Sequence, residues 1–159
     1  MQHKEVADMV EIKKILFPID LTDNSSKVFP YVLSVSKKYG SEICLLHVVE
    51  DFAKWGGEMY IPPLPLEQYR EDALNGAEEA LKEVCEAQLQ GYPSFQKKIA
   101  YGDPAREILN AIESEGIDLV VMGTHGRKGL EHVLFGSVAR NVVRRSPVPV
   151  LTVNPYKVK

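Results

Sequence analysis

Short apolar runs alternate along the chain with longer stretches in which apolar residues return every three or four positions. The short runs are nearly continuous in apolar side chains, which is typical of strands buried on both faces of a parallel sheet. Five such runs predict strands at Lys14–Pro18, Glu42–Val49, Phe95–Ala100, Leu119–Met122 and Val148–Val153. Strands that alternate with helices indicate an α/β protein with a parallel sheet.

The longer stretches predict helices with recognisable ends. Apolar residues recur at helical spacing through residues 26–39, where Gly40 is a predicted C-cap, and through residues 66–90. Asp103 and Pro104 are the residue types favoured at an N-cap and at the first position of a helix. We therefore expect a helix after each of the first three strands.

Two segments are predicted to be neither helix nor strand, within what we expect to be one domain of 159 residues. Residues 1–12 are predicted to be a loose N-terminal extension. Residues 50–65 contain Trp55, two adjacent glycines and three prolines, which break both helix and strand. Long loops are often functional, so this segment is a lid, a partner surface or only a surface loop.

Composition and charge narrow the classes of function. The net charge is −3 and the sequence pI is about 5.8, which argues against nucleic acid as a partner. No apolar run approaches the roughly 20 residues of a membrane span, and the first residues lack the apolar core of a secretory signal. We therefore expect a cytoplasmic protein that does not bind membranes. Cys44 and Cys85 are expected to be buried thiols, not disulfide partners or zinc ligands.

The stretch Leu119–Val143 has the order strand, glycine-rich loop, helix. Gly123, Gly126 and Gly129 follow the apolar run, and Gly136–Ser137 leads into apolar residues at helical spacing. The start of a helix presents backbone N–H groups at the positive end of the helix dipole, where a phosphate is stabilised. Glycines let the main chain approach such an anion closely, although they also serve as simple turns.

Polar residues in and near this stretch admit more than one interpretation. Ser137 can cap the helix or donate a hydrogen bond to a phosphate. Arg127 and Lys128 can neutralise phosphate charge or can be solvated loop residues. His47, inside an apolar strand, is expected to be packed and hydrogen-bonded.

The spacing Gly123, two residues, Gly126, nine residues, Gly136–Ser137 resembles the ATP-binding motif of the universal stress protein family. The resemblance extends over residues 14–153. It implies a five-stranded parallel sheet in the order 3-2-1-4-5 with helices on both faces, a Rossmann-like fold of the adenine nucleotide alpha hydrolase type. Ligands of such sheets bind where the strand order reverses, which here is between the first and fourth strands.

The resemblance also implies a nucleotide pocket whose parts differ in chemistry. A carboxylate would hold the ribose hydroxyls, apolar residues and the Val48 backbone would meet the adenine, and the glycine-rich loop with the last helix would bind the phosphates. The implied residues are Pro18, Ile19, Asp20, Val48, Met122, Gly123, His125, Gly126, Arg127, Gly136, Ser137 and Val138. On residue type alone, Asp20 can instead cap the next helix, His125 can be a solvated loop residue, and the apolar positions can be plain core. Ala139 departs from family members that carry a second hydroxyl there.

The resemblance implies an ATP-binding universal stress protein that acts as a nucleotide-dependent regulatory module, with magnesium bound beside the triphosphate. The alternative is an enzyme that slowly hydrolyses ATP or transfers phosphate at the same site, although the sequence lacks an evident general base or a Walker-type lysine. The strand Val148–Val153 would lie at an edge of the sheet and pair with a second copy to form a homodimer. A further protein partner is left open by the sequence.

Overall fold

A parallel sheet of five strands forms the centre of the protein, in the order β3-β2-β1-β4-β5. This computed structural model describes residues 9–51, 65–126 and 135–158. The strands are β1 (Lys14–Pro18), β2 (Glu42–Glu50), β3 (Phe95–Gly102), β4 (Leu119–Gly123) and β5 (Val150–Val153). The α/β class and the parallel sheet that the sequence pattern predicted are confirmed, and so is the strand order that the family resemblance implied.

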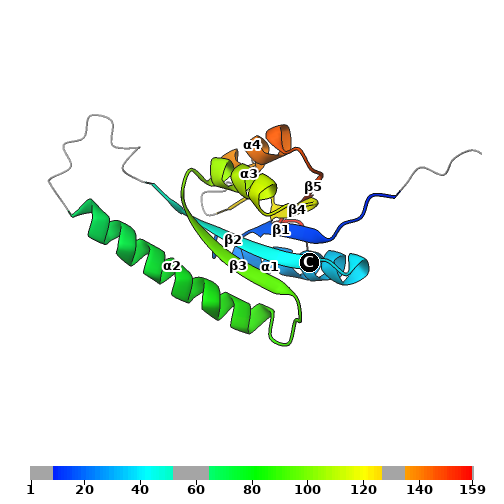
Figure 1. The fold of residues 1–159 in the computed structure, drawn as a ribbon, viewed down its shortest axis with the longest axis horizontal. Coiled ribbons are helices and arrows are strands. Elements are labelled where there is room, and N and C mark those ends of the chain that lie inside the picture. The colour runs from blue at the N-terminus through cyan, green and yellow to red at the C-terminus, as the bar shows by residue number, and fades with distance from the viewer. Residues whose placement is uncertain (1–8, 52–64, 127–134, 159) are drawn as a thin grey trace, which may run out of the picture.

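Helices cover both faces of the sheet (Figure 1). One face packs against α1 (Asp23–Tyr39) and α2 (Leu66–Gln88), and the other packs against α3 (Pro104–Ser114) and α4 (Ser137–Arg145). The apolar runs of the central strands are buried because both of their faces are covered. Phe17 of β1 and Phe29 of α1, for example, meet edge to face with ring centroids 4.9 Å apart.

The direction in which strands are added reverses between β1 and β4. The chain lays β2 beside β1 and β3 beside β2, and then α3 carries it back so that β4 pairs with the other side of β1. Ile15 pairs with Leu119 and Leu16 with Val120, so the carboxyl ends of β1 and β4 open side by side. Crevices of this kind are where open α/β sheets bind ligands.

Helix α1 begins at Asp23, three positions before the predicted start. Thr22 occupies its N-cap position, but the Thr22 hydroxyl donates to Asp20 Oδ1 and does not cap the helix. The predicted ending is confirmed, since Gly40 adopts a left-handed conformation with φ of 68°, which a glycine adopts without steric cost. The predicted start of α3 is also confirmed: Asp103 is the N-cap and its side chain accepts a hydrogen bond from Arg106 N at 2.9 Å.

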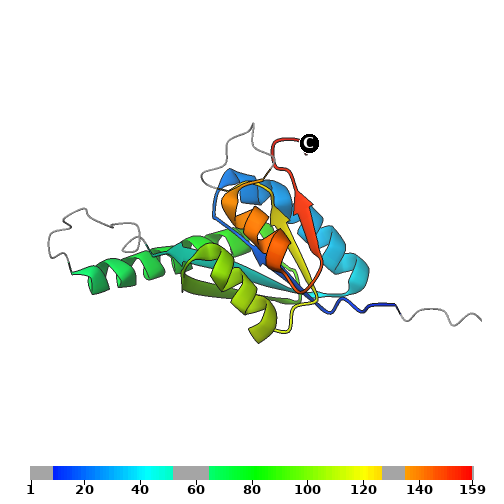
Figure 2. The same ribbon diagram turned by 90° about the horizontal axis from the view of Figure 1, so that it is seen from above.

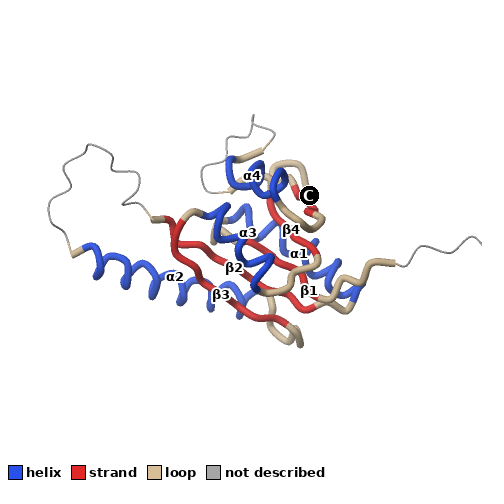
Figure 3. The backbone as a smooth tube through the Cα atoms, turned by 45° about the horizontal axis from the view of Figure 1, so that its top comes forward, coloured by secondary structure: helices blue, strands red, loops and turns tan. Residues whose placement is uncertain are grey.

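The first turns of α2 reach past the sheet, as Figure 3 shows. Tyr69 in these turns is 61% exposed, whereas Leu81 further along the helix is fully buried. One contact ties the exposed turns to the sheet, with the Arg70 guanidinium carbon 4.5 Å from the centre of the Tyr101 ring. The Tyr101 hydroxyl in turn donates to Asp51 Oδ1 at 3.0 Å. These contacts fix the start of α2 beside the carboxyl ends of β2 and β3.

Several predicted boundaries differ from those observed. Strands β2 and β3 extend to Glu50 and Gly102, while β5 begins at Val150 instead of Val148. The later start has a local cause, because Ser146 Oγ accepts from Val148 N and donates to Val148 O, which holds a turn there. The predicted irregular segment lies largely at residues 52–64, which are outside the described residues, as are residues 1–8 of the predicted extension.

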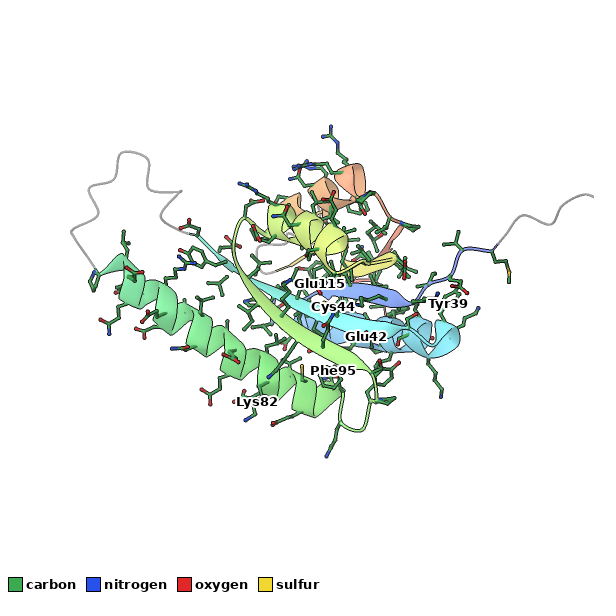
Figure 4. The ribbon with its side chains drawn as sticks, in the orientation of Figure 1. Tyr39, Glu42, Cys44, Lys82, Phe95 and Glu115 are labelled. Atoms are coloured by element: carbon green, nitrogen blue, oxygen red, sulfur yellow. The ribbon has the colours of Figure 1, made fainter. Side chains whose placement is uncertain are left out.

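Both cysteines are buried thiols, as predicted. Cys44 lies on the face of the sheet toward α3, close to Glu115 (Figure 4). Burial, and secondarily the charge of Glu115, raises the pKa of the Cys44 thiol to about 11. In the described part of the chain, no helix is long and apolar enough to cross a membrane.

Candidate functional site

A cavity of about 620 Å³ opens at the carboxyl ends of β1, β2 and β4. Its walls include the loop between β1 and α1, the end of β2, the residues after β4 and the first turn of α4. The volume lies within the range of roughly 300–1,000 Å³ that is usual for small-molecule sites. Its position at the reversal of strand order is the one expected for a ligand site in this class of sheet.

Residues distant in the sequence meet in this cavity. Eleven of the twelve predicted site residues line it, namely Pro18, Ile19, Asp20, Val48, Met122, Gly123, His125, Gly126, Gly136, Ser137 and Val138. The twelfth, Arg127, lies outside the described residues, as does Lys128. The structure thus brings the predicted positions together, while their contact with a nucleotide remains a prediction.

Asp20 both lines the cavity and organises the loop that follows β1. Its Oδ1 accepts hydrogen bonds from Thr22 N at 3.0 Å, from Thr22 Oγ1 at 2.7 Å and from Ser25 Oγ. Ser25 Oγ also accepts from Asp20 N at 3.1 Å. These bonds hold the loop in front of α1, but none of them reaches a backbone N–H of the helix, whose N-cap is Thr22. They engage Oδ1, while Oδ2 points toward Gly126.

Gly126 packs directly against the carboxylate of Asp20. A Cβ atom at Gly126 would stand 2.8 Å from Asp20 Oδ2, closer than real contacts of this kind allow. The absence of a side chain at this position therefore serves the approach of the loop to Asp20, in addition to any approach of the backbone to an anion. The spacing of the motif could not reveal this contact, because Asp20 lies far away in the sequence.

The first turn of α4 forms another wall of the cavity. Gly136, and not Ser137, is the N-cap residue, so the alternative in which Ser137 caps the helix is wrong. Gly136 N donates to Thr124 O at 2.8 Å, which joins the start of α4 to the loop after β4. Ser137 and Val138 are the first helical residues, and their N–H groups belong to the turn that lacks acceptors within a helix.

His47 is packed and hydrogen-bonded, as predicted. Its side chain is 6% exposed, and Nδ1 lies 2.8 Å from Ile19 O. Ile19 N donates to Leu46 O at 2.9 Å, so β2 holds the chain just after β1 by two contacts. His47 lines the cavity as well, which the sequence analysis did not predict.

His125 is buried, so the alternative of a solvated loop residue is wrong. Its side chain is 4% exposed, and its Nδ1 lies 2.8 Å from Thr124 Oγ1. The Tyr156 ring meets the His125 ring edge to face, with centroids 5.2 Å apart. The proposed contact between His125 and a phosphate stays a prediction.

One wall of the cavity was not predicted from the sequence. Small residues of α2 line it together with the start of α3: Ala73, Gly76, Ala77, Ala80, Asp103, Pro104 and Ile108. The residues of α2 recur at the spacing of one helix face, and this stripe of alanine and glycine is a signal that the sequence contained. Their small size keeps the space beside β2 open, and a Cβ at Gly76 would meet no atom within 4 Å.

The electrostatics of the described walls are unusual for an anion site. Among the described lining residues the charged side chains are all acidic, namely Asp20, Glu50 and Asp103. Positive potential at the cavity must therefore come from backbone N–H groups, from the α4 dipole or from residues outside the described ranges. Within those ranges, no group of three His, Cys, Asp or Glu side chains could hold a metal ion.

Comparison with known proteins gives consistent matches over nearly the whole chain. The sequence model of the universal stress protein family matches residues 11–154. Universal stress protein MJ0577 of Methanocaldococcus jannaschii is 30% identical over 156 residues, which cover 91% of this chain and 96% of that protein. The solved structure of MJ0577 superposes with a TM-score of 0.77 at 28% identity, over 91% of this chain and 97% of the other.

Two more distant structures share the fold and were solved with nucleotides. One is a universal stress protein in complex with cAMP, with a TM-score of 0.58 at 18% identity over 92% of this chain and 99% of the other. The other is the universal stress protein from Archaeoglobus fulgidus in complex with dAMP, with a TM-score of 0.54 at 16% identity over 91% and 100%. At these identities the likeness concerns the fold alone.

Proposed function

Because this chain belongs to the universal stress protein family, we propose that it is a cytoplasmic regulatory module that binds ATP with magnesium in the cavity beside β1 and β4. One observation carries the proposal: eleven residues implied by the family resemblance line a single cavity at the reversal of strand order. The complexes of distant relatives with cAMP and dAMP support an adenine nucleotide as the ligand class.

Different walls of the cavity would contact the base, the ribose and the phosphates of a nucleotide. Apolar side chains such as Ile19 and Met122 would pack against the base, whose transfer from water is favourable. The Asp20 carboxylate would accept hydrogen bonds from the vicinal ribose hydroxyls. Backbone N–H groups after β4 and at the start of α4 would bind the phosphates.

Magnesium fits the phosphate end of this arrangement. A triphosphate carries several negative charges, and the charged side chains among the described lining residues are acidic. Magnesium usually bridges phosphates while keeping most of its water ligands, so it needs few ligands from the protein. A bound Mg²⁺ would thus supply the neutralisation that these walls lack, and Arg127 is proposed to add to it.

We favour a binding module over the alternative, a slow ATP hydrolase. Hydrolysis requires a group that positions water beside the terminal phosphate. Asp20 and Asp103 are cavity-lining carboxylates that already hold backbone structure, through Thr22 N and Arg106 N respectively. Their structural engagement argues against either being a general base. Occupancy of the site by ATP would instead change the affinity for a protein partner.

The proposal includes a homodimer formed through β5. This strand lies at one edge of the sheet, and its Leu151 is 39% exposed. The opposite edge strand, β3, carries Lys97 and Lys98, and lysines on an edge oppose pairing with another strand. Two-fold pairing of β5 with β5 of a second copy would satisfy the unpaired β5 edge of each chain.

Isothermal titration of the purified protein with Mg-ATP tests the binding proposal. We expect a dissociation constant in the micromolar range, or roughly 7–8 kcal/mol of binding free energy. Gly136→Val, which would place a bulky side chain within reach of Thr124 O, serves as the variant expected to lose binding. Absence of heat and of any thermal shift with the wild type would refute the proposal. A γ-phosphate release assay on the same samples separates binding from hydrolysis.

A further inference from the structure

The C-terminal segment packs against the loop that follows β4. In Figure 2 this segment continues from the tip of β5, alongside the tip of β4. We propose that Tyr156 of this segment is a positioning residue for the phosphate side of the cavity, and that it acts through His125. This inference rests on the proposed function, since it concerns how the same site would hold its phosphates.

Tyr156 and Thr124 fix the His125 ring from two directions. The Tyr156 ring meets the imidazole at a centroid distance of 5.2 Å and an interplanar angle of 65°. Thr124 Oγ1 lies 2.8 Å from His125 Nδ1. Edge-to-face aromatic pairs are favourable beyond the area that they bury. The ring of His125 is consequently held in one orientation, and the backbone between Thr124 and Gly126 is held with it.

Tyr156 itself is anchored at several points. Asn24 Nδ2 donates to the Tyr156 hydroxyl at 3.4 Å, and Tyr156 N donates to Asn154 Oδ1 at 3.0 Å. Val158 N donates to Asn154 O at 3.2 Å, and the Val158 side chain packs against the core between the sheet and α1. Asn24 and His125 both line the cavity, Asn24 from α1 and His125 from the residues after β4. Tyr156 thus links these two walls from behind.

The loop that His125 belongs to connects three elements at the phosphate side. Thr124 N donates to Val153 O at 2.9 Å, which ties the loop to the end of β5. Gly136 N donates to Thr124 O at 2.8 Å, which ties the loop to the start of α4. Loss of the Tyr156 ring would leave His125 with room to rotate and would loosen the N–H groups of this loop. Phosphates would lose affinity, while the base and ribose, held on other walls, would lose little.

The experiment compares Mg-ATP with adenosine for Tyr156→Ala, Tyr156→Phe and the wild type, by titration calorimetry or by competition. Tyr156→Ala should weaken Mg-ATP about tenfold and adenosine less than about twofold. Tyr156→Phe keeps the ring contact and loses the hydrogen bond from Asn24, so its affinity for Mg-ATP should stay within about threefold of the wild type. If Tyr156→Ala does not fold, Tyr156→Leu replaces it with the same expectation.

A double-mutant cycle tests whether the effect passes through His125. In a His125→Ala background, Tyr156→Ala should change the affinity for Mg-ATP by less than about twofold. Three outcomes would overturn the inference. Tyr156→Ala could lose as much affinity for adenosine as for Mg-ATP, or it could lose no affinity for Mg-ATP. Tyr156→Phe could bind Mg-ATP as weakly as Tyr156→Ala does. These outcomes require a wild type that binds Mg-ATP, so a wild type that binds no nucleotide refutes the proposed function instead.

Discussion

The contact between Gly126 and Asp20 gives a sharp prediction about stability. In the variant Gly126→Ala, the new Cβ would stand 2.8 Å from Asp20 Oδ2, so the carboxylate has to move. Rotation of the carboxylate moves Oδ1 as well, and Oδ1 accepts from Thr22 N, Thr22 Oγ1 and Ser25 Oγ. The variant should therefore weaken the loop that begins α1.

The size of the effect follows from these hydrogen bonds. Weakening them by the equivalent of one hydrogen bond to a charged group costs about 1.5–3 kcal/mol. Replacing a glycine by alanine returns about 0.4–1 kcal/mol, because the unfolded chain has less conformational freedom. The net loss in the free energy of unfolding should be about 0.5–2.6 kcal/mol. For a chain of this length that corresponds to a fall in Tm of roughly 1–10 °C.

Thermal and urea unfolding followed by circular dichroism measure this loss. In an Asp20→Ala background the clash is gone, so Gly126→Ala should there be neutral or slightly stabilising. Gly76→Ala is the matched control, because a Cβ at Gly76 meets no atom within 4 Å and alanine favours a helix interior by about 1 kcal/mol. The reasoning is refuted if Gly126→Ala is as stable as the wild type, or if it loses as much stability without Asp20.

Three further predictions concern the ribose, the thiol and the edge strand. Asp20→Ala should cost about 1.5–3 kcal/mol of ATP binding while sparing inorganic triphosphate, and equal losses in calorimetry would assign Asp20 to the phosphates or to folding. Burial raises the pKa of the Cys44 thiol to about 11. Iodoacetamide at pH 8 should therefore label Cys44 far more slowly in the native protein than in urea. Rapid labelling of the native protein would contradict this. Val150→Lys with Thr152→Pro should convert the dimer to a monomer in light scattering, and a wild-type monomer or an unaffected dimer would disprove the β5 interface.

Most of the fold could be predicted from the sequence because its signals are local. The apolar runs gave all five strands, and Gly40 and Asp103 marked helix ends through conformations and hydrogen bonds made with near neighbours. The strand order came from the resemblance to the universal stress proteins and not from the pattern itself. The errors in boundaries also have local causes, as in the turn that Ser146 holds before β5.

The candidate site could be predicted only as a set of positions. The motif placed glycines before and at the start of α4, and the structure brings them to one cavity with Asp20. The motif could not show that Gly126 packs against Asp20, because that contact exists only once β4 lies beside β1. The motif also could not show the wall that α2 contributes, because that wall depends on where α2 packs on the sheet.

The sequence by itself determined the strands, the helices and the positions of the glycine motif, since periodicity, caps and turns depend on residues close together in the chain. Tertiary structure alone decided that His125 is buried. One of the groups against its ring is Tyr156, which reaches it only after β5 has completed the sheet and the chain has turned back. Long-range packing of this kind leaves no periodic signal, so residue type left open whether His125 is solvated, and the structure encloses it in the wall of the proposed phosphate site.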